Sequence, residues 1–151
     1  MTASGARWRL PGSGVGFGAT VWAPGFLAEA RLGQGDPRIA LELADEALAD
    51  APQSGNRLFE MDALLTRARA LLGSEDASYA AEVERTLADA SALIDETEAR
   101  CRAPVVHEVA AQLARLLGDD ATCERDLREA HRLFTEMGAT GHAERLAKEI
   151  K

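Results

Sequence analysis

The chain has 151 residues, enough for one domain with a sizeable core, and only 5% of them are aromatic. Its formal net charge of -8 argues against a nucleic-acid partner, because phosphates would be repelled over most of the surface. Lysine occurs only at Lys148 and Lys151, which excludes a lysine-containing phosphate-binding loop and an internal Schiff base. No apolar run approaches the ~18 residues that span a bilayer, so we expect a cytoplasmic protein without a membrane partner.

The first nineteen residues are rich in glycine, with four glycines between Gly12 and Gly18. Such a composition has high chain entropy and little to bury, so we expect residues 1–19 to form a flexible segment. Arg7 and Arg9 precede a mildly apolar stretch, but the glycines interrupt any signal-peptide core. The glycine run also lacks the lysine that would complete a phosphate-binding loop.

Helical spacing begins near Thr20, and residues 20–51 are predicted to form the first helical pair. Trp22, Phe26 and Leu27 lie on one face of its first helix. The second helix begins at Asp36-Pro37, a cap followed by a first-turn proline, and carries alanines and leucines at helical spacing. Residues 51–55 are predicted to form the turn after it.

Two further pairs and a closing helix follow, over residues 54–102, 104–137 and 141–150. The helix from about residue 56 ends at Gly73, and the next is predicted to run from Asp76 to Arg100. Pro104 suits the first turn of the following helix, and Asp119 or Asp120 is expected to cap the next. The whole chain is therefore predicted to be all-α.

An internal repeat links these pairs. Leu32-Gly33, Leu72-Gly73 and Leu117-Gly118 stand at corresponding turns, and their glycines are 40 and 45 residues apart, against ~34 in a standard tetratricopeptide unit. The excess in the middle unit is placed in residues 74–82, as a longer turn or an extra helical turn. Helical hairpins of this kind are expected to stack into a short tetratricopeptide-like right-handed superhelix, with residues 141–150 as a capping helix.

The last fifty residues resemble a known class of sequence. The residues that carry the likeness are Pro104, His107-Glu108, Leu113-Ala114, Gly118-Asp119, Leu127, Glu129-Ala130, Leu133-Phe134, Met137-Gly138-Ala139 and His142-Ala143-Glu144-Arg145-Leu146. This stretch resembles the tetratricopeptide-like C-terminal tail of bacterial signalling proteins that join an adenylate/guanylate cyclase domain to an AAA-type ATPase domain. LuxR-class ATP-binding transcription regulators carry similar tails. The resemblance implies a repeat fold and a position at the end of a long chain, and it does not point to a catalytic centre.

The chain departs from that class in what lies outside the tail. It has no cyclase strand pattern, no phosphate-loop lysine and no DNA-binding helix-turn-helix after the repeats. We therefore expect either a stand-alone repeat protein or the remainder of a truncated gene.

Few residues suggest catalysis or metal binding. His107, His131 and His142 fall in the last third, but ordinary packing or solvated histidines are favoured over a metal site. Cys101 and Cys123 occupy apolar positions of predicted helices, so both are expected to be reduced and partly buried. We predict no catalytic, cofactor or metal site.

The remaining hypothesis is protein binding. The first helix of each pair usually lines the binding face of such an array, which nominates Arg31, Arg67, His107, Glu108 and Arg115 as partner-binding residues. Arg67 and Arg115 are expected to pair with partner carboxylates. Trp22, Phe26 and Leu27, on the uncovered first pair, are candidates for an exposed apolar contact and self-association. The sequence thus favours a non-enzymatic interaction scaffold, with a regulatory signalling tail as the alternative.

Overall fold

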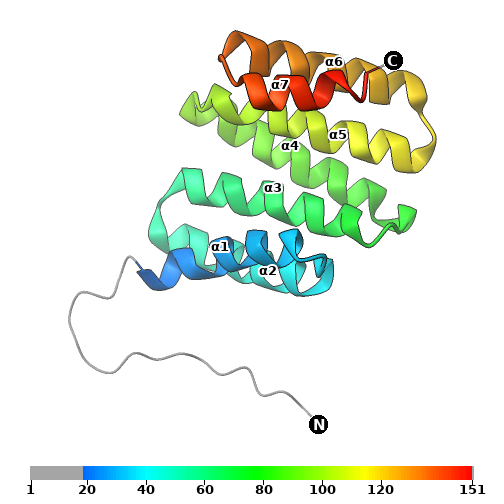
Figure 1. Ribbon diagram of the computed structural model, residues 1–151. Helices are drawn as coiled ribbons and strands as arrows, with labels where there is room; N and C mark the ends of the chain where they lie inside the picture. The colour runs from blue at the N-terminus through cyan, green and yellow to red at the C-terminus, as the bar shows by residue number, and fades with distance from the viewer. Residues whose placement is uncertain (1–18, 151) are drawn as a thin grey trace, which may run out of the picture.

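The computed structural model describes residues 19–150, with side chains from Pro24 onward, and every regular element in that range is a helix (Figure 1). The predicted all-α class is confirmed. The predicted flexible segment lies outside the described residues, except for Ala19. The elements are α1 (Ala19–Gly33), α2 (Pro37–Ser54), α3 (Arg57–Gly73), η1 (Ala77–Tyr79), α4 (Ala80–Thr97), η2 (Arg100–Arg102), α5 (Ala103–Leu117), α6 (Asp120–Glu136) and α7 (Thr140–Ala147).

Short polar side chains begin three of these helices. Asp36 accepts a hydrogen bond from the Ile39 amide at 3.2 Å, and Asn56 accepts from the Leu58 amide at 3.1 Å. Asp119, one of the two predicted caps, accepts from the amide of Thr122 at 3.0 Å. Each bond satisfies a backbone N–H that has no partner within its helix. The aspartate and asparagine positions in the sequence therefore fix where α2, α3 and α6 begin.

Two predicted boundaries were wrong. Residues 51–54 continue α2 through Pro52, and the helix ends only at Gly55, whose φ of 63° is left-handed. The single helix predicted from Asp76 to Arg100 is divided into η1, α4 and the region of η2. Glu98 ends α4 with a left-handed φ of 56°, a conformation that cannot continue a right-handed helix. η1, a single 3-10 turn directly before α4, lies in the region 74–82 where a longer turn or an extra helical turn was predicted.

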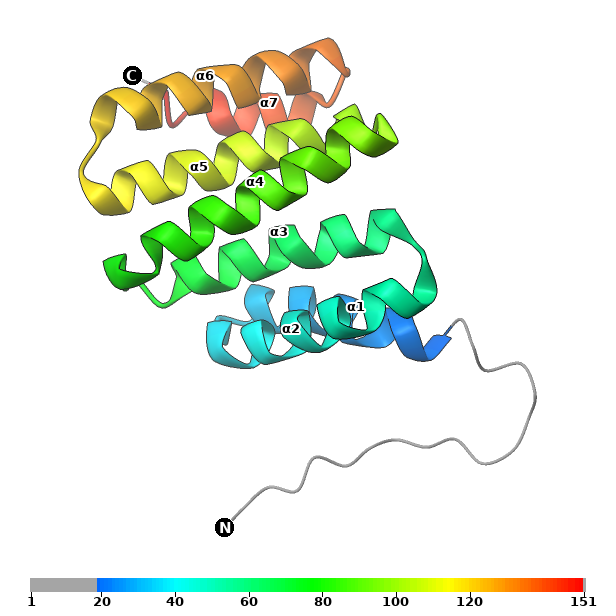
Figure 2. The same cartoon turned by 180° about the vertical axis from the view of Figure 1, so that it is seen from behind.

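The helices stack in chain order, from α1 and α2 at one end to α6 and α7 at the other (Figures 1 and 2). α3 packs against four helices: α1, α2, α4 and α5. α1 and α3 also touch directly, as do α3 and α5, so the first helices of successive pairs are neighbours. The handedness of the stack and its likeness to tetratricopeptide arrays remain predictions.

The core is built from different side chains at the two ends. The contact between α1 and α2 is closed by buried alanines, Ala28, Ala40, Ala44, Ala47 and Ala51. The central cluster joins α3, α4 and α5 through larger side chains such as Met61, Val83, Ile94 and Leu113. A second cluster joins α5, α6 and α7 around Leu127, Phe134 and Leu146. Small residues let α1 and α2 lie close, but they bury less apolar area than the central cluster does.

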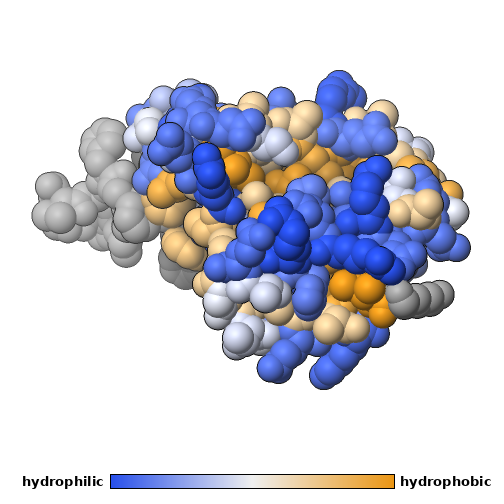
Figure 3. Space-filling view, turned by 90° about the horizontal axis from the view of Figure 1, so that it is seen from above, coloured by the Kyte–Doolittle hydropathy of each residue, from blue (hydrophilic) through white to orange (hydrophobic). Residues whose placement is uncertain are grey.

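The α6–α7 end presents mostly hydrophilic side chains to solvent. Seen from that end, hydrophilic residues cover much of the surface, with hydrophobic areas between them (Figure 3). α7 meanwhile buries Ala143 and Leu146 against α6 and α5. This is what a terminal helix must do if the stack is to end there without a further neighbour.

One close backbone approach joins the first pair to α3. A Cβ atom at position 73 would lie 2.8 Å from Pro37 Cβ and 3.9 Å from Leu32 Cδ1. Gly33, at the corresponding turn of the first unit, has no atom within 4 Å of such a Cβ. Glycine is therefore required at position 73 by packing, whereas at position 33 it is not.

We predict that Gly73→Ala lowers the free energy of unfolding by about 1–3 kcal/mol, the usual penalty for overpacking. Gly33→Ala is the matched control, and it should leave the stability unchanged or raise it by up to ~1 kcal/mol. Urea unfolding followed by circular dichroism measures both. Equal effects of the two substitutions would contradict the close approach of Gly73 to Pro37.

Candidate interaction surface

An open groove with a volume of about 630 Å³ lies on the side formed by the first helices of the three pairs. Leu32 of α1, Leu72 of α3 and Leu116 of α5 each contribute one apolar side chain to it. The polar residues around them are Arg69, Glu75, Gln112 and Arg115. The groove therefore combines a leucine from each of three helices with two arginines and one carboxylate.

The two arginines of the groove are only partly engaged. Arg69 Nη1 lies 3.8 Å from Glu29 Oε1, at the limit of an ion pair. Arg115 Nη2 lies 3.2 Å from Glu149 Oε2, a hydrogen bond that raises the pKa of Arg115. Ion pairs this exposed contribute ~0–1 kcal/mol each, so a partner carboxylate can exchange with them at little cost. In a chain of net charge -8, the lining of this groove holds two arginines against one glutamate, Glu75.

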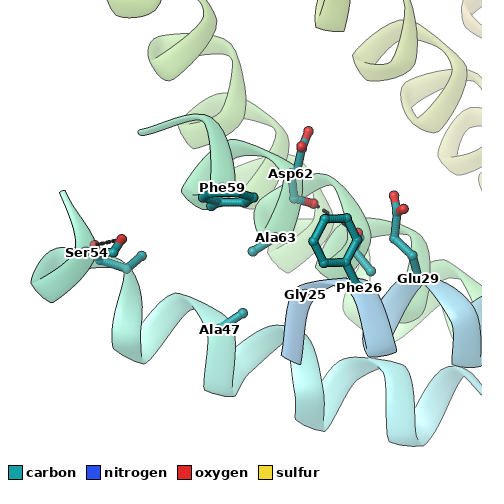
Figure 4. Close-up of a pocket in the computed structure, with 10 residues that line it drawn as sticks. Gly25, Phe26, Glu29, Ala47, Ser54, Phe59, Asp62 and Ala63 are labelled. Atoms are coloured by element: carbon teal, nitrogen blue, oxygen red, sulfur yellow. Dashed lines mark hydrogen bonds between the residues drawn. The ribbon is translucent and has the colours of Figure 1, made fainter. Parts of the chain in front are cut away.

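A second, smaller pocket of about 50 Å³ lies between α1, α2 and α3 (Figure 4). The rings of Phe26 and Phe59 meet edge to face, with centroids 6.5 Å apart. Apolar lining also comes from Ala47, Ala51 and Ala63, and Glu29 and Asp62 add carboxylates. In Figure 4 both carboxylates lie on the side away from Ala47 of α2. This pocket is thus apolar inside and acidic at one side.

The electrostatics of Asp62 follow from its surroundings. Burial raises the pKa of Asp62 above its usual value, and the ion pair that Arg102 Nε makes with Asp62 Oδ1 at 3.0 Å only partly opposes this. The negative charge of Glu29 adds to the increase in the pKa of Asp62. Each of the two carboxylates therefore faces one arginine, Glu29 facing Arg69 and Asp62 facing Arg102.

The side chain of Arg67 connects α3 to α2 and α4. Its guanidinium donates to Asp45 of α2 at 2.6 Å, to Thr86 of α4 at 2.9 Å and also to Glu82 of α4. Only 19% of the Arg67 side chain is exposed. Because its donors already meet three acceptors in this chain, we leave Arg67 out of the surface that we propose below.

The other residues nominated from the sequence are spread over the molecule. His107 Nδ1 lies 3.0 Å from Oδ1 of the buried Asp126 on α6, and Glu108 accepts from Arg145 of α7 at 2.7 Å. Arg31 donates to Gln34 of its own turn at 3.3 Å. Of the five nominated partner-binding residues, Arg115 lines the groove.

The exposed apolar contact predicted at Trp22, Phe26 and Leu27 falls only partly within the described side chains. Phe26 is 62% exposed and Leu27 is 51% exposed. Leu58, in the first turn of α3, is 52% exposed. The side chain of Trp22 lies outside the described residues. Exposed apolar side chains therefore occur in the middle of α1 and in the first turn of α3.

Sequence reasoning missed Arg69 and the apolar role of the groove leucines. Arg69 follows Asp62 by seven residues and precedes Leu72 by three, a spacing that places all three on one face of α3. The signal was present, but α3 is buried on several sides, so its outward face could not be chosen from periodicity alone.

The prediction that Cys101 is partly buried was wrong. Cys101 lies in η2 and is exposed, whereas Cys123 in α6 is buried. Residue 101 is part of a short turn outside the helix stripe on which the prediction relied. Its thiol therefore contributes nothing to the core.

The predicted chemistry of the histidines can be compared with the described residues. The ring of His142 stacks on Phe134, with centroids 4.7 Å apart. Among the side chains that the structure describes, no three histidine, cysteine or carboxylate groups are close enough together to hold a metal ion. Within residues 19–150 no helix has the length and apolar character needed to cross a bilayer.

Comparison with known proteins adds no assignment. No protein-family model, curated protein or solved structure matches this chain. The likeness to cyclase–ATPase tails therefore rests on the residues of the last fifty positions, and the functional proposal rests on the groove.

We predict that Arg67→Ala lowers the free energy of unfolding by about 1.5–3 kcal/mol, because it leaves charged acceptors on α2 and α4 without their donor. The matched control is Arg38→Ala, which removes an i,i+4 pair with Glu42 whose side chains are 76% and 65% exposed. That loss should stay within ~0.5 kcal/mol. Urea unfolding of both variants decides the point, and a loss in Arg67→Ala no larger than in Arg38→Ala would contradict the role of Arg67.

The raised pKa of Asp62 predicts that the free energy of unfolding depends on pH. Its folded-state pKa is raised, so its stabilising contribution is fully present below the unfolded-state value of 3.8 and is lost as the pH rises through the folded-state pKa. Asp62→Asn removes this titration while keeping an acceptor for Arg102. The unfolding free energy of the variant relative to the parent should therefore rise between acidic and neutral pH. A difference that is constant with pH, or that falls, would contradict the assignment.

Proposed function

We propose that this chain is a non-enzymatic helical-repeat scaffold that binds a segment of another protein in the groove between α1, α3 and α5. The observation that carries the proposal is the groove itself, with one leucine from each helix between Arg69 and Arg115. Apolar side chains of a partner would fill the space over the leucines, and its carboxylates would take the guanidinium donors.

The chemistry of the partner follows from this combination. An arginine offers five N–H donors in a fixed fork that suits a carboxylate, and the glutamate partners of the two groove arginines, Glu29 and Glu149, are 55% and 37% exposed. We therefore propose an acidic segment with leucine-like side chains beside its carboxylates. A basic or purely polar segment would leave Arg69 and Arg115 facing like charge or would leave the leucines uncovered.

A regulatory role in signalling is the second proposal, and the resemblance of residues 104–146 to cyclase–ATPase tails favours it. In that case the groove would bind a segment of a nucleotide-dependent ATPase or cyclase and modulate its activity or a transcriptional response. The two proposals share the groove and differ in the partner. The two proposals can be distinguished by identifying the proteins that the parent chain captures from a lysate. Only proteins that the groove variant described below fails to capture count as partners.

We predict that selection of a displayed random dodecapeptide library on the immobilised protein enriches peptides with a carboxylate next to an apolar side chain. Replacing the carboxylates of an enriched peptide by amides should weaken binding about ten- to hundredfold, since a charge-assisted hydrogen bond contributes about 1.5–3 kcal/mol. The variant Arg69→Glu with Arg115→Glu should bind that peptide no better than background, as measured by fluorescence anisotropy.

Arg38→Glu serves as the control, because it changes the net charge at an exposed site of α2 outside the groove lining. It should bind the peptide like the parent chain, apart from a small general charge effect. Enrichment of basic peptides, or binding that the groove variant leaves intact, would overturn the proposed surface.

A further inference from the structure

The groove arginine Arg115 already binds a carboxylate of its own chain. Its Nη2 atom donates to Glu149 Oε2 at 3.2 Å, and Glu149 lies in the turn that follows α7. Glu149 reaches this guanidinium from outside the residues that line the groove. Arg115 therefore belongs to the groove and at the same time holds an acidic side chain from a different part of the fold.

The backbone around Glu149 is held in place on both sides. The amides of Glu149 and Ile150 donate to the carbonyl oxygen of Leu146 at 2.9 and 3.2 Å. Leu146 is 1% exposed in the cluster between α5, α6 and α7, and Ile150 packs against the same cluster. A carboxylate on such a turn loses little further conformational freedom when it pairs. Glu149 is therefore a better ligand for Arg115 than a carboxylate on a free chain would be.

A second arginine also faces Glu149. Arg145 Nη1 lies 3.7 Å from Glu149 Oε1, and Arg145 Nη2 donates to Glu108 Oε2 of α5 at 2.7 Å. Four side chains of alternating charge thus connect α5 with α7 and the turn after it, in the order Glu108, Arg145, Glu149 and Arg115. Because Arg145 remains beside it, Glu149 keeps a cationic neighbour when Arg115 turns to another carboxylate.

The pair between Arg115 and Glu149 is open to exchange. The exposed fractions of the two side chains are 56% and 37%. Water and a partner carboxylate can reach a pair this exposed, and its contribution to stability is small. The exchange requires side chains to rotate, whereas α7 keeps its apolar contacts through Ala143 and Leu146.

We propose that Glu149 is an internal competitor that regulates the affinity of the groove for its partner. This inference rests on the function proposed above, in which a carboxylate of the partner takes Arg115. In the free protein Glu149 occupies that guanidinium, and in the complex the partner's carboxylate replaces it while Glu149 stays beside Arg145. The turn after α7 thereby lowers the affinity of the groove for carboxylate ligands, and neutralising Glu149 removes that reduction.

The test compares the binding of a carboxylate-containing peptide, enriched by the library selection above, to Glu149→Gln and to the parent chain by fluorescence anisotropy. The variant should bind the peptide about two- to fivefold more tightly, the range expected when an exposed ion pair no longer competes. Glu144→Gln is the matched control, since it removes the same charge from an exposed position of α7. It should bind like the parent chain. Equal affinities of the two variants, both folded by circular dichroism, would overturn the competition.

A double-mutant cycle assigns the effect to Arg115. In an Arg115→Gln background there is no guanidinium for Glu149 to occupy, and Arg69 remains to bind the peptide. Glu149→Gln should then change the affinity no more than Glu144→Gln does. A gain in affinity that persists in this background would overturn Arg115 as the point of competition.

Two different results distinguish the role of Glu149 from the binding role of the groove. A peptide that binds the parent chain and Glu149→Gln equally well would overturn the role of Glu149 and leave the groove as a binding surface. Selection is also carried out on immobilised Glu149→Gln, in which the proposed competitor is neutral. A library that yields no carboxylate-containing peptide on either protein would contradict both the proposed function and the competition.

Discussion

The guanidinium of Arg67 joins three helices at the point where the small first pair meets the larger core. It reaches Asp45 of α2 and both Thr86 and Glu82 of α4 from the middle of α3. A charge that is largely withdrawn from water is tolerated only where its donors find acceptors, and here three are supplied. The first pair contributes mainly alanines to its own contact, so a directional polar contact fixes how it sits on α3 more firmly than apolar area alone.

The groove depends on the same helix. Arg67 and Arg69 are two residues apart, which is about 200° around an α-helix, so they leave α3 on opposite sides. With Arg67 held toward α2 and α4, Arg69 is directed to the side shared with α1 and α5. Gly73 then allows the turn before α2 to come against the end of α3. One arginine thus serves the fold, and the other is left for a partner.

Much of the architecture could be predicted from the sequence because it depends on local signals. Asp36 and Asp119 as caps, Gly118 as a left-handed stop and the recurring Leu-Gly turns each act over a few residues. The continuation of α2 through Pro52 was missed because a proline in the last turn reads as a break. Cys101 was misplaced because η2 interrupts the helical spacing there.

The site was harder to predict because it belongs to no single segment. Leu32, Leu72 and Leu116 come from three helices about forty residues apart, and only packing brings them to one groove. On α3, buried residues run from Met61 through Leu65 and Thr66 to Leu71 and cover more than one face. Periodicity then gives the spacing of the residues but not the rotation of the helix, so Arg67 was chosen where Arg69 lines the groove.

The most direct test of this account is a set of nuclear Overhauser effects at Gly73 in the full chain in solution. Because position 73 lies against Pro37 and Leu32, the account predicts strong effects from the Gly73 α protons to both side chains. These contacts place the ends of α1 and α3 beside each other, and the groove exists only if they are so placed. Assigned spectra in which Gly73 shows no effect to Pro37 or Leu32 would contradict the arrangement and, with it, the proposed binding surface.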